Sequence, residues 1–171
     1  MLSNSTRSKF EVLFSPLVIF FVATTIIIGL EISKNLSLNE SVDGKKHICG
    51  CAFNCMDARV QSPVEDGTKR ECCVDMVDVI TQAGIVKVLA ENKNKALVDN
   101  FKYELEISVK KHGTKSVSIV AHHDCAGNPV SKEEQVKHLR QAKKTVESFG
   151  FNVEIILLWV DAPFKKAELI P

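Results

Sequence analysis

Apolar residues follow two different periods in the part of the chain beyond residue 46. Short apolar or alternating runs, which are typical of buried strands, occupy residues 47–54, 74–81, 116–121 and 152–160. Between them, apolar residues spaced three and four positions apart predict amphipathic helices over about residues 85–112 and 131–149. The run at 74–81 alternates only in part, so a helix is its competing interpretation. Residues 61–70 are polar, contain Pro63 and Gly67, and predict a loop.

The boundaries and order of these elements indicate a fold class. Ser131 and Glu134 have the S-x-x-E spacing of a helix capping box, and Gly113 and Gly150 are suited to end helices. Alternating strands and helices predict an α/β domain with a small, open, mostly parallel sheet flanked by helices. Right-handed crossovers place strand 47–54 beside strand 116–121, so their carboxyl ends flank a crevice of the kind that binds ligands. A short tail follows residue 160.

Residues 12–30 are nearly all apolar and long enough to span a bilayer, which takes about 20 residues. Arg7 and Lys9 precede this run, as in a signal peptide, but no A-x-A cleavage site follows it. An uncleaved transmembrane anchor is therefore our first interpretation, and a cleaved signal peptide is the second. A buried core helix ranks third, because the run has no polar face.

The anchor divides the chain into four segments. Residues 1–11 form a polar N-terminal segment, 12–30 the transmembrane anchor or signal peptide, 31–46 a polar tether and 47–171 the folded domain. The positive charges before the anchor favour a cytoplasmic N-terminus, although three lysines on its other flank reduce this bias. We therefore expect a single-pass membrane protein with an extracytoplasmic domain.

The net charge and the cysteine content limit the classes of function that the chain can have. The net charge is +1 and no basic stripe is present, which argues against nucleic acid as a partner. Six cysteines are compatible with disulfides in an exported protein, but their uneven spacing does not resemble a small disulfide scaffold. We therefore favour metal or free-thiol roles for Cys55 and Cys125.

The candidate chemistry follows two strands that we expect to be neighbours. Cys55 comes directly after strand 47–54, and His122 and Cys125 come directly after strand 116–121. Two thiolates and one imidazole suit Zn²⁺, and three protein ligands leave a fourth position open for water or substrate. Asp57 can accept a hydrogen bond from water at that position or occupy the position itself. Arg59 can hold Asp57 ionised and oriented.

The combination of C-x-D-x-R at 55–59 with H-x-x-C at 122–125 resembles the β-class carbonic anhydrases. The segments CMDAR, AHHDCAGNP and LLWVD are similar to a short, divergent branch of that family. The resemblance implies that Cys55, His122 and Cys125 bind zinc and that Asp57 and Arg59 gate the fourth position. It further implies a β-carbonic anhydrase-like fold and reversible hydration of carbon dioxide to bicarbonate by zinc-bound hydroxide, with a homodimer as a possible assembly. His123 is a candidate proton shuttle.

The chain departs from the family pattern at three places. The usual R-N-A-G segment is replaced by residues 81–84, TQAG, so its Arg and Asn are lost. H-x-x-C is followed by Ala126 and then Gly127 rather than directly by Gly, and the family's N-terminal helical arm has no counterpart. Two alternatives therefore stay open: a zinc-binding structural or interaction module without turnover, and an enzyme acting on COS or CS₂.

Overall fold

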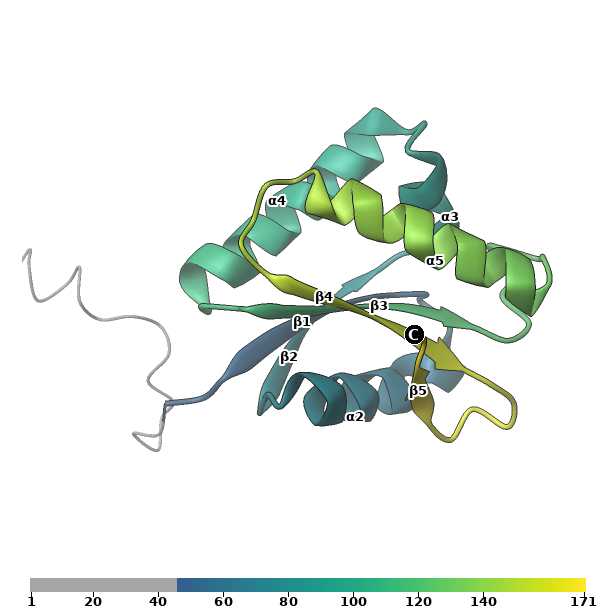
Figure 1. The fold of residues 1–171 in the computed structure, drawn as a ribbon, viewed down its shortest axis with the longest axis horizontal. Helices are drawn as coiled ribbons and strands as arrows, with labels where there is room; N and C mark the ends of the chain where they lie inside the picture. Colours follow the sequence, from purple (N-terminus) through teal and green to yellow (C-terminus); the bar gives the residue numbers. More distant parts are fainter. Residues whose placement is uncertain (1–45) are drawn as a thin grey trace, which may run out of the picture. The chain divides into compact units, whose positions relative to one another are not determined.

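The computed structural model describes residues 46–171, which form a five-stranded sheet with helices on both faces (Figure 1). The strand order is β2-β1-β3-β4-β5; the first four strands are parallel, and the last is antiparallel to its neighbour. The strands are β1 (Cys49–Asn54), β2 (Met76–Thr81), β3 (Ser116–His122), β4 (Glu154–Val160) and β5 (Ala167–Leu169). The predicted class, a small and mostly parallel α/β sheet flanked by helices, is confirmed.

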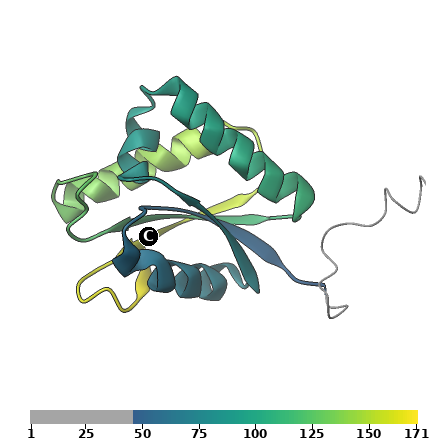
Figure 2. The ribbon, with the colours of Figure 1, turned by 180° about the vertical axis from the view of Figure 1, so that it is seen from behind.

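The helices are distributed unequally over the sheet. They are the 3-10 turn η1 (Ala58–Val60) and the α-helices α2 (Gln61–Cys72), α3 (Ile85–Glu91), α4 (Lys95–Lys111) and α5 (Lys132–Glu147). Helix α2 covers one face of the sheet, and α3, α4 and α5 cover the other, as Figure 2 shows from behind. Alternate residues of β3 enter the two cores: Ile119 packs on the three-helix side and Val120 on the α2 side.

The predicted neighbours are in contact. Strand β1 pairs in parallel with β3, with Cys51 opposite Val117. The N-terminus of α5 also begins as predicted, because the backbone N–H of Glu134 donates to Ser131 Oγ at 3.3 Å. The stretch at 74–81 contains strand β2 rather than a helix.

The prediction of a loop over residues 61–70 is wrong, because these residues form most of α2. Pro63 lies in the first turn of the helix, where a missing backbone N–H costs no helical hydrogen bond. Gly67 marks a close approach and not a turn: a Cβ at this position would lie 2.6 Å from Ala167 Cβ. Both residues that indicated a loop are therefore explained by helix geometry and packing.

The structure corrects two further expectations. The helical region from residue 85 is two helices, since Asn92 is left-handed (φ 48°) and Asn94 caps α4 by accepting from Leu97 N–H at 3.2 Å. The tail after residue 160 adds β5 to the sheet, where Ala167 is fully buried. Arg70 of α2 holds this strand by donating to the Ala167 carbonyl at 2.6 Å.

The predicted anchor at residues 12–30 lies outside the described residues, as do the segment 1–11 and nearly all of the tether at 31–46. Within residues 46–171, no helix combines the length and the apolar character that crossing a membrane requires.

Candidate metal centre

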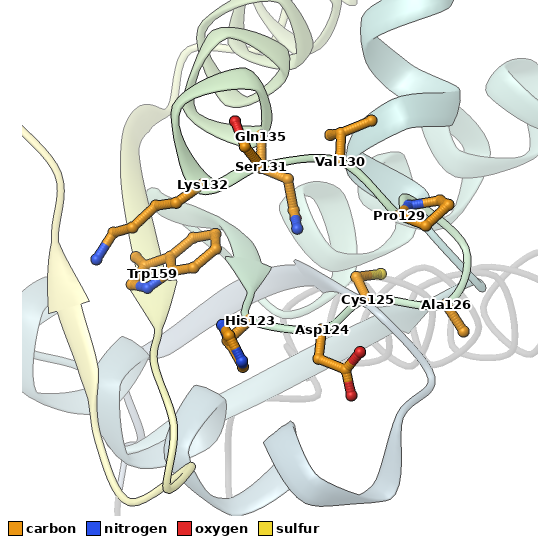
Figure 3. Close-up of a pocket in the computed structure, with 10 residues that line it drawn as sticks. All are labelled: His123, Asp124, Cys125, Ala126, Pro129, Val130, Ser131, Lys132, Gln135 and Trp159. Atoms are coloured by element: carbon orange, nitrogen blue, oxygen red, sulfur yellow. The ribbon is translucent and has the colours of Figure 1, made fainter.

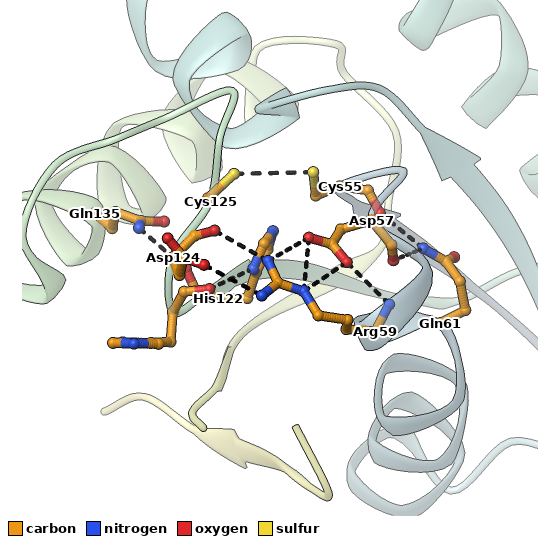
Figure 4. Close-up of polar contacts among 9 residues, drawn as sticks. Cys55, Asp57, Arg59, Gln61, His122, Asp124, Cys125 and Gln135 are labelled. Carbon is orange, nitrogen blue, oxygen red and sulfur yellow. Dashed lines mark hydrogen bonds and ion pairs between the residues drawn. The ribbon is translucent and has the colours of Figure 1, made fainter. Parts of the chain in front are cut away.

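Cys55, His122 and Cys125 come together at the carboxyl ends of β1 and β3 (Figure 4). One donor atom from each residue lies within 4.8 Å of the others, and the two Sγ atoms are 3.8 Å apart. All three side chains are buried. The adjacency of β1 and β3 thus brings together residues almost 70 positions apart, as the sequence predicted.

The hydrogen bond of His122 defines which ring nitrogen is available. Nδ1 lies 2.8 Å from the backbone carbonyl oxygen of His123, which can only accept, so Nδ1 carries the proton and donates. Nε2 is then an unprotonated acceptor, and it is buried without any hydrogen-bond partner. Burial also lowers the pKa of His122, which favours this neutral form. A neutral imidazole with a free, buried Nε2 beside two thiols fits a metal ligand.

The Cys125 thiol is held in surroundings that disfavour its negatively charged form when no cation is present. Burial, first, and the adjacent Cys55, second, raise the pKa of Cys125. The backbone N–H groups of Gly127 and Asn128 act in the opposite direction by hydrogen-bonding to this sulfur. All six cysteines lie in the described part of the chain, and each is a free thiol.

Asp57 and Arg59 form the predicted pair. Arg59 donates from Nη2 to Asp57 Oδ2 at 2.7 Å, from Nε to Oδ1 at 3.0 Å and from its backbone N–H to Oδ1 at 2.9 Å. These hydrogen bonds, led by that of the Arg59 side chain, lower the pKa of Asp57 to about 2. Asp57 is therefore a carboxylate throughout the physiological pH range.

Arg59 also reaches the second loop of the site. It donates from Nη1 to Asp124 Oδ2 at 3.2 Å and from Nη2 to the Asp124 carbonyl at 3.1 Å. Its guanidinium lies 4.4 Å from the centre of the Phe164 ring. Arg59 therefore connects the loop after β1, the loop after β3 and the segment before β5, a role that the spacing C-x-D-x-R does not indicate.

Two glutamines that sequence reasoning missed hold the backbone of the site. Gln61 Nε2 donates to the carbonyls of Cys55 at 2.9 Å and Asp57 at 2.6 Å. Gln135 of α5 donates from Nε2 to the His122 carbonyl at 3.0 Å. No local motif identifies either residue, because each acts on a carbonyl that only the fold brings within reach.

Two cavities adjoin the cluster. The smaller, about 10 Å³, is lined by all three candidate ligands and is large enough for about one water-sized molecule. The larger, about 380 Å³, lies at the N-terminus of α5 and is shown in Figure 3. His123 and Trp159 line the larger cavity, whereas Cys55 and His122 line only the smaller. His123 is thus placed beside the ligands but outside their cavity.

These features define a class of protein: a mostly parallel α/β domain with a buried Cys₂His donor set that fits zinc, at the carboxyl ends of two adjacent strands. Residues 45–170 match the family model described as "Putative carbonic anhydrase", and the chain belongs to this family. The resemblance stated from CMDAR and AHHDCAGNP is therefore confirmed.

Several solved carbonic anhydrases are similar to this chain. That from Streptococcus mutans is 16% identical with a TM-score of 0.46, covering 94% of this chain and 100% of its own. The β-carbonic anhydrase CafA of Aspergillus fumigatus is 13% identical with a TM-score of 0.39, covering 92% and 90%. The β-carbonic anhydrase isoform I of Trichomonas vaginalis is 16% identical with a TM-score of 0.39, covering 92% and 98%. A search of curated proteins found no significant match.

Proposed function

We propose that this protein catalyses the reversible hydration of carbon dioxide to bicarbonate at a zinc ion held by Cys55, His122 and Cys125. The observation that carries the proposal is the buried, unpartnered Nε2 of His122 beside two thiols whose sulfurs are 3.8 Å apart. Membership of the carbonic anhydrase family supports the same reaction. A zinc ion bound here supplies a Lewis acid that lowers the pKa of water towards about 7 and so provides hydroxide at neutral pH.

The chain's own residues orient the reactants. Asp57 provides an acceptor that is ionised throughout the physiological pH range, and a hydrogen bond to it directs the lone pair of the attacking oxygen towards the carbon of the substrate. Arg59 fixes the direction of that carboxylate through a bidentate ion pair, in which Nε and Nη2 each donate to a different carboxylate oxygen. The apolar residues Ile85, Val86 and Ala121 line the ligand cavity and suit an uncharged gas. His123, which is exposed and lines the larger cavity, is our candidate for passing the released proton to solvent.

The test uses the purified full-length protein. We expect one zinc per chain by elemental analysis and carbon dioxide hydration by stopped flow, both lost in Cys55→Ser. Cys73→Ser, which alters an exposed thiol outside the cluster, is the matched control and should retain both. Zinc without hydration would contradict the proposal and favour the structural module, unless the same preparation hydrolysed COS or CS₂. Absence of zinc in the wild-type protein would contradict both proposed activities, the hydration of carbon dioxide and the hydrolysis of COS or CS₂.

We further propose that residues 12–30 anchor the chain in a membrane with the catalytic domain outside the cytoplasm. The length of the apolar run and the positive charges before it support this topology. Carbonate-resistant membrane association and protease access from the outer side test it. We also propose that the chain forms a homodimer, as its resemblance to the family implies. Light scattering of the purified protein tests this assembly.

A further inference from the structure

The ligand cavity contains a second unpartnered polar group besides His122. Among residues 46–171, four buried side-chain nitrogen or oxygen atoms lack a hydrogen-bond partner, and they belong to Asn54, His122, Asn128 and Trp159. Two of these residues, His122 and Asn128, line the same small cavity. Asn128 is only 1% exposed, so solvent does not satisfy its amide. A buried amide oxygen without a hydrogen-bond partner lowers the stability of the folded protein, so its presence at this site needs an explanation.

The backbone and side chain of Asn128 are both held in place. Its N–H donates to the Cys125 carbonyl at 3.0 Å, which closes the turn after the H-x-x-C segment. Its Nδ2 lies 3.2 Å from His138 Nδ1 on α5. The His138 side chain is only 15% exposed, and its Nε2 lies 3.9 Å from Glu134 Oε1. The amide is therefore oriented from behind by a mostly buried imidazole.

Turning the Asn128 amide over changes which of its polar atoms lacks a partner, but in either orientation one of them does. In the orientation described, Nδ2 contacts His138 and Oδ1 is left without a partner. Turning the amide over pairs Oδ1 with His138 and leaves Nδ2 without one. In both cases one polar atom of Asn128, a residue that lines the cavity of the ligands, is left without a partner.

Few other polar groups are available in this cavity. Its remaining walls are chiefly apolar, from α3 and β3, and include Ile85, Val86 and Ala121. The Gln135 amide nitrogen already donates to the His122 carbonyl. The cavity has room for about one water-sized group, such as a single oxygen atom of a substrate, and the unpartnered atom of the Asn128 amide is a hydrogen-bonding group available to it.

We propose that Asn128 is a substrate-binding residue: with its amide turned so that Oδ1 accepts from His138 Nδ1–H, its Nδ2 donates a hydrogen bond to one oxygen atom of carbon dioxide or bicarbonate, and His138 is the positioning residue that holds the amide in this direction. This inference rests on the proposed function, since it names a group of the same site. In this role the Asn128 amide orients a small substrate that contains oxygen atoms, in a cavity whose other walls are chiefly apolar. His138 contributes through its contact with the amide and not by contact with substrate, and Glu134 lies beside the other ring nitrogen of His138.

The experiment compares metal content, catalysis and binding in the full-length protein. In Asn128→Ala we expect one metal per chain and an approximately tenfold higher KM for carbon dioxide with a smaller change in kcat, which is the loss of one hydrogen bond to a bound ligand. The dissociation constant for bicarbonate, measured from the visible spectrum of the Co²⁺-substituted protein, should rise by about the same factor. Asn152→Ala, at an exposed asparagine outside the site, is the matched control.

His138 provides an independent variant that leaves the turn of Asn128 intact. His138→Ala should weaken bicarbonate binding in the same direction, and His138→Gln, which again offers an amide to Asn128, should restore it. An unchanged bicarbonate affinity in Asn128→Ala with full metal content would overturn the inference. Loss of the metal in that variant would also overturn it, because Asn128 would then only support the ligand loop.

The outcomes for the two proposals are distinguishable. If the wild-type protein hydrates carbon dioxide and Asn128→Ala does so with unchanged KM, the role of Asn128 fails and the proposed function stands. If the wild-type protein binds bicarbonate without hydrating carbon dioxide, the proposed function fails. The effect of Asn128→Ala on the bicarbonate dissociation constant then still tests the binding role.

Discussion

Gly84 and Gly127 pack against each other so closely that neither position has room for a side chain. A Cβ on Gly84 would lie 2.3 Å from the Gly127 carbonyl oxygen, and a Cβ on Gly127 would lie 2.4 Å from the Gly84 nitrogen. Gly84 caps α3 in a left-handed conformation (φ 59°), and Gly127 lies two residues after Cys125. This contact positions the ligand loop against the loop that follows β2. It gives a structural reason for a glycine at both positions.

Gly84→Ala should destabilise the protein more than an alanine at another left-handed glycine. Gly150 is the matched control, because its φ is 81° and a Cβ there meets nothing within 4 Å. Left-handed backbone alone costs an alanine about 1–2 kcal/mol, whereas the clash at Gly84 adds about 1–3 kcal/mol. Denaturant unfolding of both variants measures the difference. Equal losses of stability would show that the Gly127 loop yields without cost.

Cys125→Ala should abolish stoichiometric zinc binding, because two remaining protein ligands do not make a stable zinc site. Elemental analysis should fall from one zinc per chain to about none, and Cys73→Ser should leave it unchanged. Removing the metal from the wild-type protein with a chelator should lower its melting temperature, since a ligand that binds only the folded state stabilises it. A Cys125→Ala protein that retained tight zinc would refute the donor set.

The arrangement of the sheet was predictable because it depends on local patterns and on a general rule of chirality. The β-branched run before His122 and the small, apolar run before Cys55 identified two buried strands, and right-handed crossovers placed them side by side. The candidate ligand set followed from these two strands. The error over residues 61–70 arose because Pro63 and Gly67 punctuate turns in isolation, whereas here one lies in the first helical turn and the other faces Ala167.

The supporting residues of the site were not predictable for a different reason. Arg59 bonds to Asp124, 65 positions away, and Gln135 bonds to the carbonyl of His122 from another element. Contacts of this kind depend on side-chain directions that hydrophobic periodicity does not encode. The burial of Asn128 and His138 has the same origin.

Arg59→Lys should retain zinc but reduce the rate of carbon dioxide hydration by about 10- to 100-fold. This range is typical of residues that do not bind the metal themselves but orient the groups around it. Lysine keeps the positive charge but cannot reproduce the contacts of Nε and Nη2 with both carboxylate oxygens of Asp57. Zinc analysis and stopped-flow hydration of the same preparation measure the effect. Arg140→Ala, which alters an exposed arginine on α5, is the control. A fully active Arg59→Lys would mean that charge alone is sufficient.

The Asp57–Arg59 pair should make stability depend on pH in a defined acidic window. The hydrogen bonds of Arg59 lower the pKa of Asp57 to about 2 in the folded protein, whereas an aspartate in the unfolded chain has a pKa of about 3.9. The unfolded state therefore binds a proton first as the pH falls, so the contribution of the pair is fully present above about pH 4 and is lost as the pH approaches about 2. Asp57→Asn removes the titrating group without changing its size. The difference in unfolding free energy between the wild type and Asp57→Asn should therefore be larger at pH 7 than at pH 2.5, measured by denaturant titration of the metal-free proteins. A difference that does not change between these pH values would show that Arg59 leaves the pKa of Asp57 in its ordinary unfolded range.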